Sequence, residues 1–384
     1  MEPVVGVICE YDPFHRGHAR QYALIRERLP GARIVCVMSG CFTQRGMPAL
    51  FAPRFRAEAA LRAGADLVLE LPCAFAVREA ENFALGGVSV LDQLGFVTHL
   101  SFGVEHDEPE ALARAAALCE QPTQAYRADL RALLSEGRSL AAAQGAALAR
   151  ALPESAALFA APNDILALCY LRALLRLQSD MQPLPVLREG DYHAQSIGLW
   201  PSASAVRKAL LAGDRAAAEA ACGYALDAPL HAPSALDKAL LYRLRGMSAA
   251  ELRALPDCTE GLENRLLTAA RGATDRETLL SALKTKRYAY ARLNRLLTHA
   301  LLGVTGELLQ SQPVPSYARL LGFRKESEAL LSRLKQSKIP VVAKAADGDF
   351  GDPFYQLDER AYDLWALGAN QPAGLMQRGG VAVI

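Results

Sequence analysis

Two histidines near the start of the chain, His15 and His18, have the type and spacing that most clearly point to chemistry. They follow residues 4–9, a β-branched, apolar run typical of a buried parallel strand, and a polar turn. From residue 19 onward the apolar residues recur at helical spacing, so the histidines lie where a helix begins. Backbone N–H groups and the helix dipole favour an anion there, and two imidazoles can hydrogen-bond the phosphates of a nucleotide.

A His-x-x-His pair also has simpler interpretations, either as surface or core residues or as two ligands of a zinc ion. No cysteine or carboxylate of the turn clearly completes a tetrahedral zinc set. The eight cysteines are scattered without a C-x-x-C pair, so we interpret them as small core residues of a protein in a reducing compartment. The sequence therefore predicts no set of protein metal ligands.

Composition narrows the class of protein. The chain of 384 residues is long enough for two or three domains, and 51% hydrophobic with 22% charged residues is ordinary for a globular protein. With a formal net charge of +1, any contact with nucleic acid must come from a local basic patch. There is neither an apolar run of transmembrane length nor a signal-peptide pattern, so we expect a cytoplasmic protein with no membrane partner.

The first half of the chain alternates strand and helix patterns, which predicts an α/β fold with a parallel sheet and right-handed crossovers. Strands are expected at residues 4–9, 33–38, 66–72, 97–102 and 185–190, and helices at residues 53–63 and 79–94. The arginines of the first of these two helices lie at spacing that we interpret as exposed. Residues 39–46 follow the second strand, at the sheet edge where open α/β sheets bind ligands.

Two further helix starts carry polar residues. Pro162 and Asn163 open a helix that runs to about residue 177, where the simplest role for Asn163 is a cap. Ser202, Ser204 and Arg207 open another helix, and serines with an arginine one turn in form a second possible anion site. Ordinary capping is again the alternative.

Beyond about residue 225 the pattern becomes helical. Residues 279–302 are expected as one long helix, and its stretch 284–295 holds five basic residues, two tyrosines and no acid. Basic residues interleaved with tyrosine suit contacts with RNA phosphates and bases, although a solvated helix face gives the same pattern. Residues 316–338 are expected as a second basic helical segment, 339–343 as a short strand and 371–384 as a loose tail.

The predicted organisation is a doubly wound, parallel-sheet, Rossmann-like domain over residues 1–225, with a helical insertion at about 107–160. A mainly α-helical, tRNA-binding domain is expected over residues 226–384.

The motif His15-Arg-Gly-His18 resembles the H-x-G-H signature of the nucleotidyltransferase superfamily of HUP-type fold, which also contains the class I aminoacyl-tRNA synthetases. Several stretches together resemble the bacterial tRNA(Met) cytidine acetate ligase family. They are Glu-Tyr-Asp-Pro-Phe-His-Arg-Gly-His (10–18), Met-Ser-Gly-Cys-Phe-Thr-Gln-Arg-Gly (38–46), Gly-Ala-Asp-Leu-Val-Leu-Glu-Leu-Pro (64–72), Ala-Glu-Asn-Phe-Ala (80–84), Leu-Ser-Phe-Gly-Val-Glu (100–105), Pro-Asn-Asp-Ile-Leu (162–166), Tyr-His (192–193), Ser-Ala-Ser-Ala-Val-Arg (202–207), Leu-Glu-Asn-Arg (262–265), Lys-Thr-Lys-Arg-Tyr (284–288) and Leu-Leu-Gly-Phe (320–323).

This resemblance implies an ATP-dependent ligase that joins acetate to AMP and then transfers the acetyl group to N4 of the wobble cytidine of elongator tRNA(Met). Its substrates are ATP, accompanied by Mg²⁺, acetate and that tRNA.

ATP enters the first step with the histidines at its α-phosphate, where they stabilise the charge that develops as pyrophosphate leaves.

The resemblance also implies site residues. An ATP-binding segment spans Val7, Ile8, Cys9, Glu10, Tyr11, Asp12, Pro13, Phe14, His15, Arg16, Gly17, His18, Ala19 and Arg20, with further ATP contacts at Gly103, Asn163 and Arg188. The superfamily pattern adds Ser202, Ser204 and Arg207 for the triphosphate, and Lys284, Lys286 and Arg287 are candidates for contact with the tRNA backbone.

Three positions depart from the family pattern, which commonly has Asn at Asp12, Arg16 and Cys41. Asp12 places a negative charge near the phosphates or helps to hold Mg²⁺. Two other functions stay open: a small-molecule adenylyltransferase, which gives the basic distal half no role, and a non-catalytic RNA-binding protein. The oligomeric state and the range of carboxylates accepted are also open.

Overall fold

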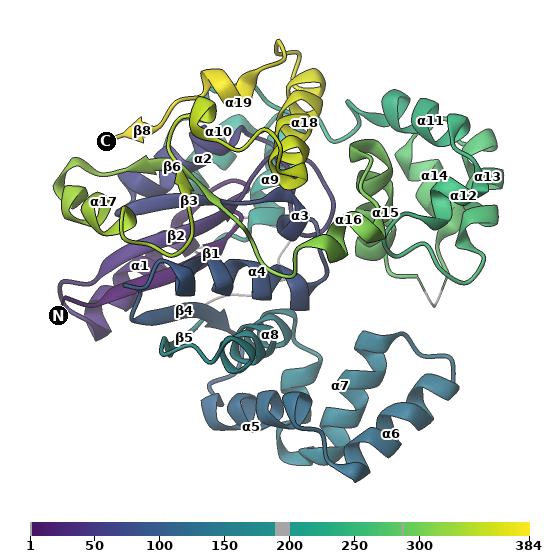
Figure 1. Cartoon of the computed structure of the whole chain (residues 1–384), viewed down its shortest axis with the longest axis horizontal. Coiled ribbons are helices and arrows are strands. Elements are labelled where there is room, and N and C mark those ends of the chain that lie inside the picture. The colour runs from purple at the N-terminus through teal and green to yellow at the C-terminus, as the bar shows by residue number, and fades with distance from the viewer. Residues whose placement is uncertain (1, 189–199, 286–287) are drawn as a thin grey trace.

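The computed structural model describes residues 2–188, 200–285 and 288–384, and it is built around one eight-stranded sheet (Figure 1). The strand order is β5-β4-β1-β2-β3-β6-β7, and β8 pairs with β6. The strands are β1 (Val4–Cys9), β2 (Arg33–Ser39), β3 (Leu67–Leu71), β4 (His99–Val104), β5 (Gln182–Leu187), β6 (Ala318–Phe323), β7 (Val341–Val342) and β8 (Ala382–Val383).

The five strands expected from the first half of the chain are all present and pair in parallel, which confirms the Rossmann-like prediction. β4 and β5 are displaced by two or three residues from their expected limits. Alternate residues of a strand point to opposite faces. Val35 and Val37 of β2 therefore join the core on one face, while Ile34 and Cys36 join the core on the other.

Crossover helices cover both faces, as a doubly wound sheet requires. Helices α1 (Arg16–Arg28) and α2 (Pro53–Arg62) pack on one face, and α4 (Ala80–Gln93) and α8 (Pro162–Leu177) on the other. A short helix, α3 (Cys73–Ala76), follows β3. The turns after β1 and β2 consequently meet at the carboxyl edge of the sheet.

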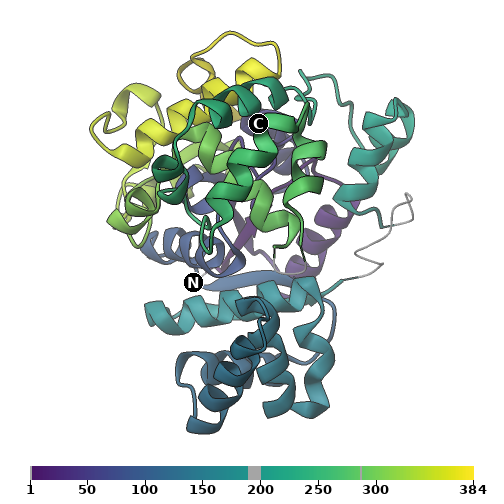
Figure 2. The same cartoon turned by 90° about the vertical axis from the view of Figure 1, so that its right-hand side faces the viewer.

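Two groups of helices stand beside the sheet. The expected insertion forms α5 (Pro109–Glu120), α6 (Gln124–Ser135), α7 (Leu140–Ala151) and η1 (Pro153–Phe159), below the sheet in both views (Figures 1 and 2). A helical unit with its own leucine-rich core is built from α11 (Asp237–Gly246), α12 (Ala249–Arg253), α13 (Leu262–Gly272), α14 (Arg276–Leu283) and α15 (Tyr290–Leu302). Between them in sequence lie α9 (Ala203–Leu211) and α10 (Arg215–Cys222).

The C-terminal part of the chain returns to the sheet. After α16 (Gly306–Ser311), β6 pairs antiparallel with β3, so residues on the far side of the predicted boundary at 225 extend the same sheet. The remaining elements are η2 (Lys325–Ser327), α17 (Glu328–Leu334), η3 (Ala345–Asp347), α18 (Pro353–Gly368) and α19 (Leu375–Arg378).

Three local expectations for the distal half are wrong. Residues 316–338 are not one basic helix, because β6 occupies 318–323 and buries Arg319 in an ion pair with Glu70, Nη1 to Oε2 2.6 Å. The tail is not loose, since α19 and β8 hold it. The helix expected over 279–302 is divided into α14 and α15. Lys286 and Arg287 lie outside the described residues.

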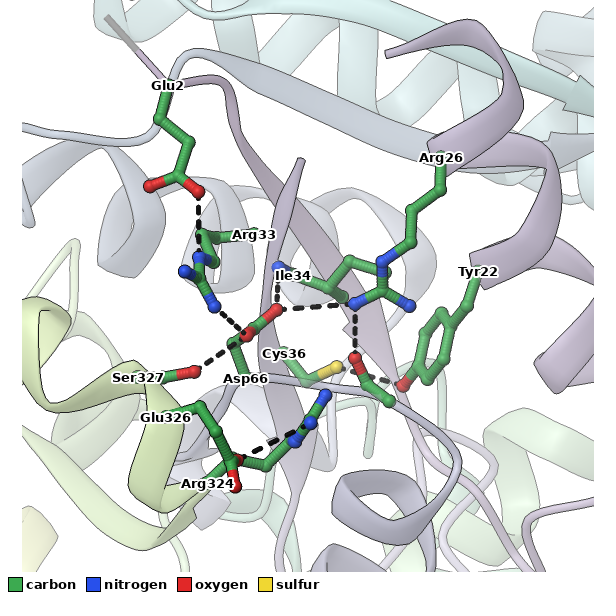
Figure 3. A network of polar contacts seen from close by, with 11 residues as sticks. Glu2, Tyr22, Arg26, Arg33, Ile34, Cys36, Asp66, Arg324, Glu326 and Ser327 are labelled. Atoms are coloured by element: carbon green, nitrogen blue, oxygen red, sulfur yellow. Dashed lines mark hydrogen bonds and ion pairs between the residues drawn. The ribbon is translucent and has the colours of Figure 1, made fainter. Parts of the chain in front are cut away.

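At the amino edge of the sheet, the buried carboxylate of Asp66 joins four parts of the chain (Figure 3). It accepts hydrogen bonds from the Ile34 backbone N–H at 2.8 Å and the Ser327 hydroxyl at 2.6 Å. Arg26 and Arg33 form ion pairs with it at 3.4 and 3.2 Å. Both oxygens are thus used for tertiary structure alone.

No single helix among the described residues is long and apolar enough to cross a membrane. The bent pair of η1 and α8 reaches the required length and composition when taken together.

Candidate active site

The two histidines form the cap of α1. His15 is the N-cap residue, and its Nδ1 accepts the backbone N–H of Gly17 at 3.1 Å. His18 Nδ1 accepts the backbone N–H of His15 at 3.2 Å, which completes a reciprocal capping box. The two rings stack with their centroids 3.7 Å apart. The H-x-G-H motif therefore orients both imidazoles through the backbone of the turn that contains them.

These hydrogen bonds also define which nitrogen carries the proton. An Nδ1 that accepts a hydrogen bond has no hydrogen, so in the neutral ring the proton is on Nε2. Burial, together with the nearby charges of Arg188 and Arg207, lowers the pKa of His15 to about 3. Burial and the charge of His15 likewise lower the pKa of His18 well below its usual range. Both side chains are therefore neutral Nε2–H donors, suited to phosphate oxygens.

Aromatic residues of the turn and of α1 pack against His18 and against one another. The ring of Tyr11 lies 4.8 Å from that of His18, and the ring of Phe14 lies 5.4 Å from it. The hydroxyl groups of Tyr11 and Tyr22 are hydrogen-bonded at 2.6 Å, which ties the turn to α1. Because these groups are buried, the position of His18 is determined by packing as well as by the cap.

Two cavities meet at the histidines. A narrow cleft lies between Arg20, Gln21 and Leu24 of α1 and the end of β5 at Leu187. A larger cavity of about 600 Å³ extends over the carboxyl ends of β1 and β2 toward α4 and α8. Residues that line both are His15, His18, Gln21, Gly103, Arg188 and Ser202. A molecule that occupies both spaces must pass the two histidines.

Gly103, Asn163 and Arg188 come from separate elements and meet beside the histidines. Arg188 Nη1 donates to Asn163 Oδ1 at 3.4 Å, and Asn163 Nδ2 donates to Glu105 Oε1 at 2.8 Å. A Cβ at Gly103 would lie 3.1 Å from the Arg188 side chain, so glycine gives that arginine room. Asn163 is not the cap of α8, since Ala161 occupies that position and has no side-chain bond.

The start of α9 forms the opposite wall. Ser202 is its N-cap and accepts the backbone N–H of Ala205 at 3.1 Å. Arg207 donates to the Asp12 carbonyl oxygen at 2.7 Å and to the Ser204 hydroxyl at 3.0 Å. α9 is thereby joined to the turn after β1, and its arginine faces the larger cavity.

Asp12 has a structural use. Its Oδ1 accepts the backbone N–H of Leu50 at 2.7 Å, and its Oδ2 lies 3.9 Å from Arg207 Nη1. The carboxylate therefore connects the turn after β1 to the loop after β2. Of the other two departures from the family pattern, Arg16 is exposed and Cys41 is buried.

Most residues of the predicted ATP site line one cavity or both. They are Val7, Ile8, Cys9, Glu10, Tyr11, Asp12, His15, Gly17, His18, Arg20, Gly103, Asn163, Arg188, Ser202, Ser204 and Arg207. Within the described part of the chain, Pro13, Phe14, Arg16 and Ala19 line neither of these two cavities.

Comparison with known proteins finds matches over almost the whole chain. A family model described as HIGH Nucleotidyl Transferase matches residues 1–378. A protein of Acetivibrio thermocellus named tRNA(Met) cytidine acetate ligase is 34% identical, and the alignment covers 96% of both chains. A protein of Syntrophomonas wolfei with the same name is 33% identical over 96% of both. The chain belongs to the tRNA(Met) cytidine acetate ligase family.

Solved structures of the family agree with the fold. Thermotoga maritima TmcAL bound with α-thio ATP superposes with a TM-score of 0.87 at 28% identity, and covers 98% of this chain and 96% of its own. The apo form of the same protein gives the same values. The predicted nucleotidyltransferase fold is therefore confirmed, and this family is an enzyme family.

Arg56 is a site-supporting residue that the sequence pattern missed. It was expected to be exposed, but its side chain is fully buried. Its guanidinium donates to the carbonyl oxygens of Glu10, Ser39, Gly40 and Phe51. It thus holds the turns after β1 and β2 together. Every residue has a backbone carbonyl group, so partners of this kind leave no pattern of side chains in the sequence that could have predicted the burial of Arg56.

Of the predicted tRNA contacts, Lys284 lies among the described residues, where it ends α14 of the helical unit. Lys284 donates to the Thr285 carbonyl oxygen at 2.6 Å, and its Nζ lies 5.4 Å from the centre of the Tyr290 ring. Tyr290 is 52% exposed and opens α15, so a cation and an aromatic face are presented together. This is the combination that suits an RNA strand.

Proposed function

We propose that this protein activates acetate as acetyl-AMP and transfers the acetyl group to N4 of the wobble cytidine of elongator tRNA(Met). The observation that carries the proposal is the pair of neutral, stacked histidines at the junction of two cavities. The names of relatives that match almost the whole chain supply the substrate class.

In the first step a carboxylate oxygen of acetate attacks the α-phosphorus of ATP and pyrophosphate leaves. Negative charge grows on the phosphate oxygens, and Nε2–H donors held in place stabilise it without reorganisation. Gly103, Arg188 and Ser202 line both cavities beside these donors, and we assign them to the nucleotide. Ser204 and Arg207 line only the larger cavity, and we assign them to the β- and γ-phosphates.

In the second step the cytidine amine attacks the acetyl carbonyl and AMP leaves. The amine is a weak nucleophile because its lone pair is delocalised into the ring, so it needs a positioned and water-shielded acyl-adenylate. An anticodon base has to leave its stack to reach such a cavity. Lys284, Lys286 and Arg287 are the proposed contacts for the tRNA backbone, and we expect the reaction to take place in the cytoplasm.

We also propose that Mg²⁺ accompanies ATP. No group of three or more His, Cys, Asp and Glu side chains among the described residues has the arrangement of a metal site. The phosphates and water must then provide most of its ligands, which is usual for Mg²⁺. Bound there, Mg²⁺ would neutralise charge on the triphosphate.

The decisive experiment incubates the purified protein with ATP, labelled acetate and a mixture of tRNAs, and then digests the RNA to nucleosides. The proposal expects label in N4-acetylcytidine from elongator tRNA(Met) alone, with AMP and pyrophosphate as co-products. Label in no tRNA nucleoside would overturn the proposal. Acetate-dependent pyrophosphate exchange without RNA labelling would support the adenylation step and refute the proposal that tRNA accepts the acetyl group.

A further inference from the structure

One carboxylate that lines the larger cavity uses only one of its two oxygens for a contact within the fold. Glu10 directly follows β1, and its Oε1 accepts the Gln44 backbone N–H at 2.5 Å. Within the described residues, Oε2 has no hydrogen bond or ion pair. Glu10 is half-buried and lines the larger cavity, but it does not line the narrow cleft beside α1.

The negative charge of Glu10 is unfavourable for binding two of the three substrates. Phosphate and acetate are both anions, and a carboxylate repels them. The cytosine amine is different, because it is an N–H donor for which a glutamate is a natural acceptor. The adenine amine is also a donor. Because Ser204 and Arg207, which we assign to the β- and γ-phosphates, line only the larger of these two cavities, we place adenine at the other end of the nucleotide, in the narrow cleft, which Glu10 does not line.

The larger cavity that Glu10 lines also contains aromatic side chains. Phe83, Phe102 and Tyr170 line it, and the ring centres of Phe102 and Tyr170 lie 5.7 Å apart. Aromatic side chains bind an unstacked base through its π-face. The polar edge of such a base would then be directed to the polar groups of the same wall.

The loop on the other side of Glu10 is attached to the helical unit that we assign to tRNA. The Thr298 hydroxyl of α15 donates to the Gly46 carbonyl oxygen at 2.6 Å, and Arg276 Nη1 donates to Met47 Sδ at 3.4 Å. The same loop supplies the Gln44 N–H that orients Glu10. The proposed RNA-binding unit and this wall of the cavity are therefore one continuous structure.

We propose that the wall formed by Glu10, Phe83 and Tyr170 is the subsite for the acceptor cytosine, and that Glu10 accepts the N4 proton during acetyl transfer. This inference rests on the proposed function and names the group that performs its second step. Glu10 is then a catalytic residue of the transfer step, and it also favours a base that carries an amino group.

The transfer step balances as follows. A bond forms between cytosine N4 and the acetyl carbon, and the bond between that carbon and the AMP phosphate oxygen breaks. AMP leaves as a phosphate monoester, and the extra N4 proton passes to the Glu10 carboxylate and then to solvent. No oxidant or further co-reactant is needed.

The electrostatic surroundings favour a carboxylate of raised basicity. Burial raises the pKa of Glu10, and the charge of Asp12 on the same turn acts in that direction. The Gln44 N–H, Arg207 on α9 and Arg45 on the loop lower it. The charge of Glu10 in turn contributes to the raised pKa of Tyr170 on α8, after burial and the effect of Cys9.

The test separates the two steps in the full-length protein with the variant Glu10→Gln. Transfer is measured in a single turnover from synthetic acetyl-AMP to elongator tRNA(Met), and adenylation by acetate-dependent pyrophosphate exchange. We expect Glu10→Gln to slow transfer by about 100-fold or more, and to slow it far more than it slows exchange. Glu79→Gln is the matched control, since Glu79 precedes α4 beside the cavity without lining it.

Several results would overturn the inference. Equal losses in both steps would make Glu10 a structural residue. A loss in exchange alone, with a raised Mg²⁺ requirement, would make it a metal ligand. If Glu10→Gln does not fold, the wild-type pH profile decides: an acid limb of the transfer rate at or below the ordinary carboxyl pKa of about 4.3 would contradict the proton-acceptor role. Absence of product from the wild type is a separate result, and would refute the proposed function itself.

Discussion

The two edges of the sheet use buried polar groups in opposite ways. At the amino edge, both oxygens of Asp66 bind groups of the protein itself (Figure 3). At the carboxyl edge, His15 and His18 use only Nδ1 for the cap, and Glu10 uses only one oxygen for the loop. At the amino edge the hydrogen-bonding atoms of Asp66 stabilise the fold, whereas at the carboxyl edge some hydrogen-bonding atoms remain available for substrates.

The buried groups that line the cavities at the carboxyl edge have perturbed pKa values. The histidines are dehydrated without a charged partner, and burial lowers the pKa of both. Burial raises the pKa of Glu10 for the same reason. Perturbed groups that face a cavity are typical of functional sites. Substitutions at the carboxyl edge should therefore change activity, and substitutions at the amino edge should change stability.

The largest effect is expected at His18. His18→Ala should lower acetate-dependent pyrophosphate exchange by about 100- to 1000-fold, because it removes a positioned donor to the transition state. The unfolding free energy should fall by only about 1 kcal/mol, the usual value of a cap. His18→Asn keeps an acceptor near the Nδ1 position, and His18→Gln keeps an amide near Nε2. Higher activity in the Asn variant than in the Gln variant would show that only the cap matters.

At the amino edge, Asp66→Ala should lower the unfolding free energy by about 3 kcal/mol, because it leaves two buried donors without their acceptor and removes one ion-pair partner from each of two arginines. Urea unfolding measures the loss. The activity of the folded fraction should stay within about twofold of the wild type, since Asp66 lines neither of these two cavities. Glu2→Ala, which removes the exposed partner of Arg33, is the control and should cost about 0.5 kcal/mol or less. A large loss of activity in folded Asp66→Ala would break the contrast between the edges.

A smaller effect is expected at Gly46, where φ is +77° and a Cβ would lie 2.5 Å from the Arg295 backbone nitrogen. Gly46→Ala should lower tRNA acetylation by about tenfold, because strain and contact together move the loop that orients Glu10. Gly137→Ala is the matched control, with φ of +81° and no atom within 4 Å of the added Cβ. Similar acetylation rates in the two variants would show that the contact with α15 does not position the loop.

The smallest effect concerns pH and His299, which donates Nε2–H to the Val77 carbonyl oxygen at 2.8 Å. Burial lowers its pKa to about 4. The unfolded chain then binds more protons below about pH 6.5, so stability is fully present above that pH and is lost as the pH falls toward 4. His299→Gln keeps the donor without the charge. The unfolding free energy of this variant should be lower than that of the wild type at about pH 7. The difference should shrink by about 1–2 kcal/mol between about pH 7 and pH 5. A difference that does not vary with pH would contradict this assignment.

The local pattern of the first half was sufficient to predict β1 to β5, their crossover helices and the position of the histidines. Buried strands and amphipathic helices have distinct periods, and each such element is specified by neighbours in sequence. β6 was missed because its charged residue, Arg319, looked exposed. Its partner Glu70 lies 249 positions away, and only pairing with β3 brings the two together.

The sequence by itself determined that an H-x-G-H cap would follow a buried strand, and the cap geometry needs only the residues that contain it. The tertiary structure decided which groups face this cap. Asn163, Arg188 and Arg207 come from distant elements, Arg56 binds carbonyl oxygens, and Asp12 and Glu10 have different partners although they are two residues apart. The physical reason is range: capping and periodicity act over a few residues, whereas burial and ion pairing depend on segments that meet only in the folded chain.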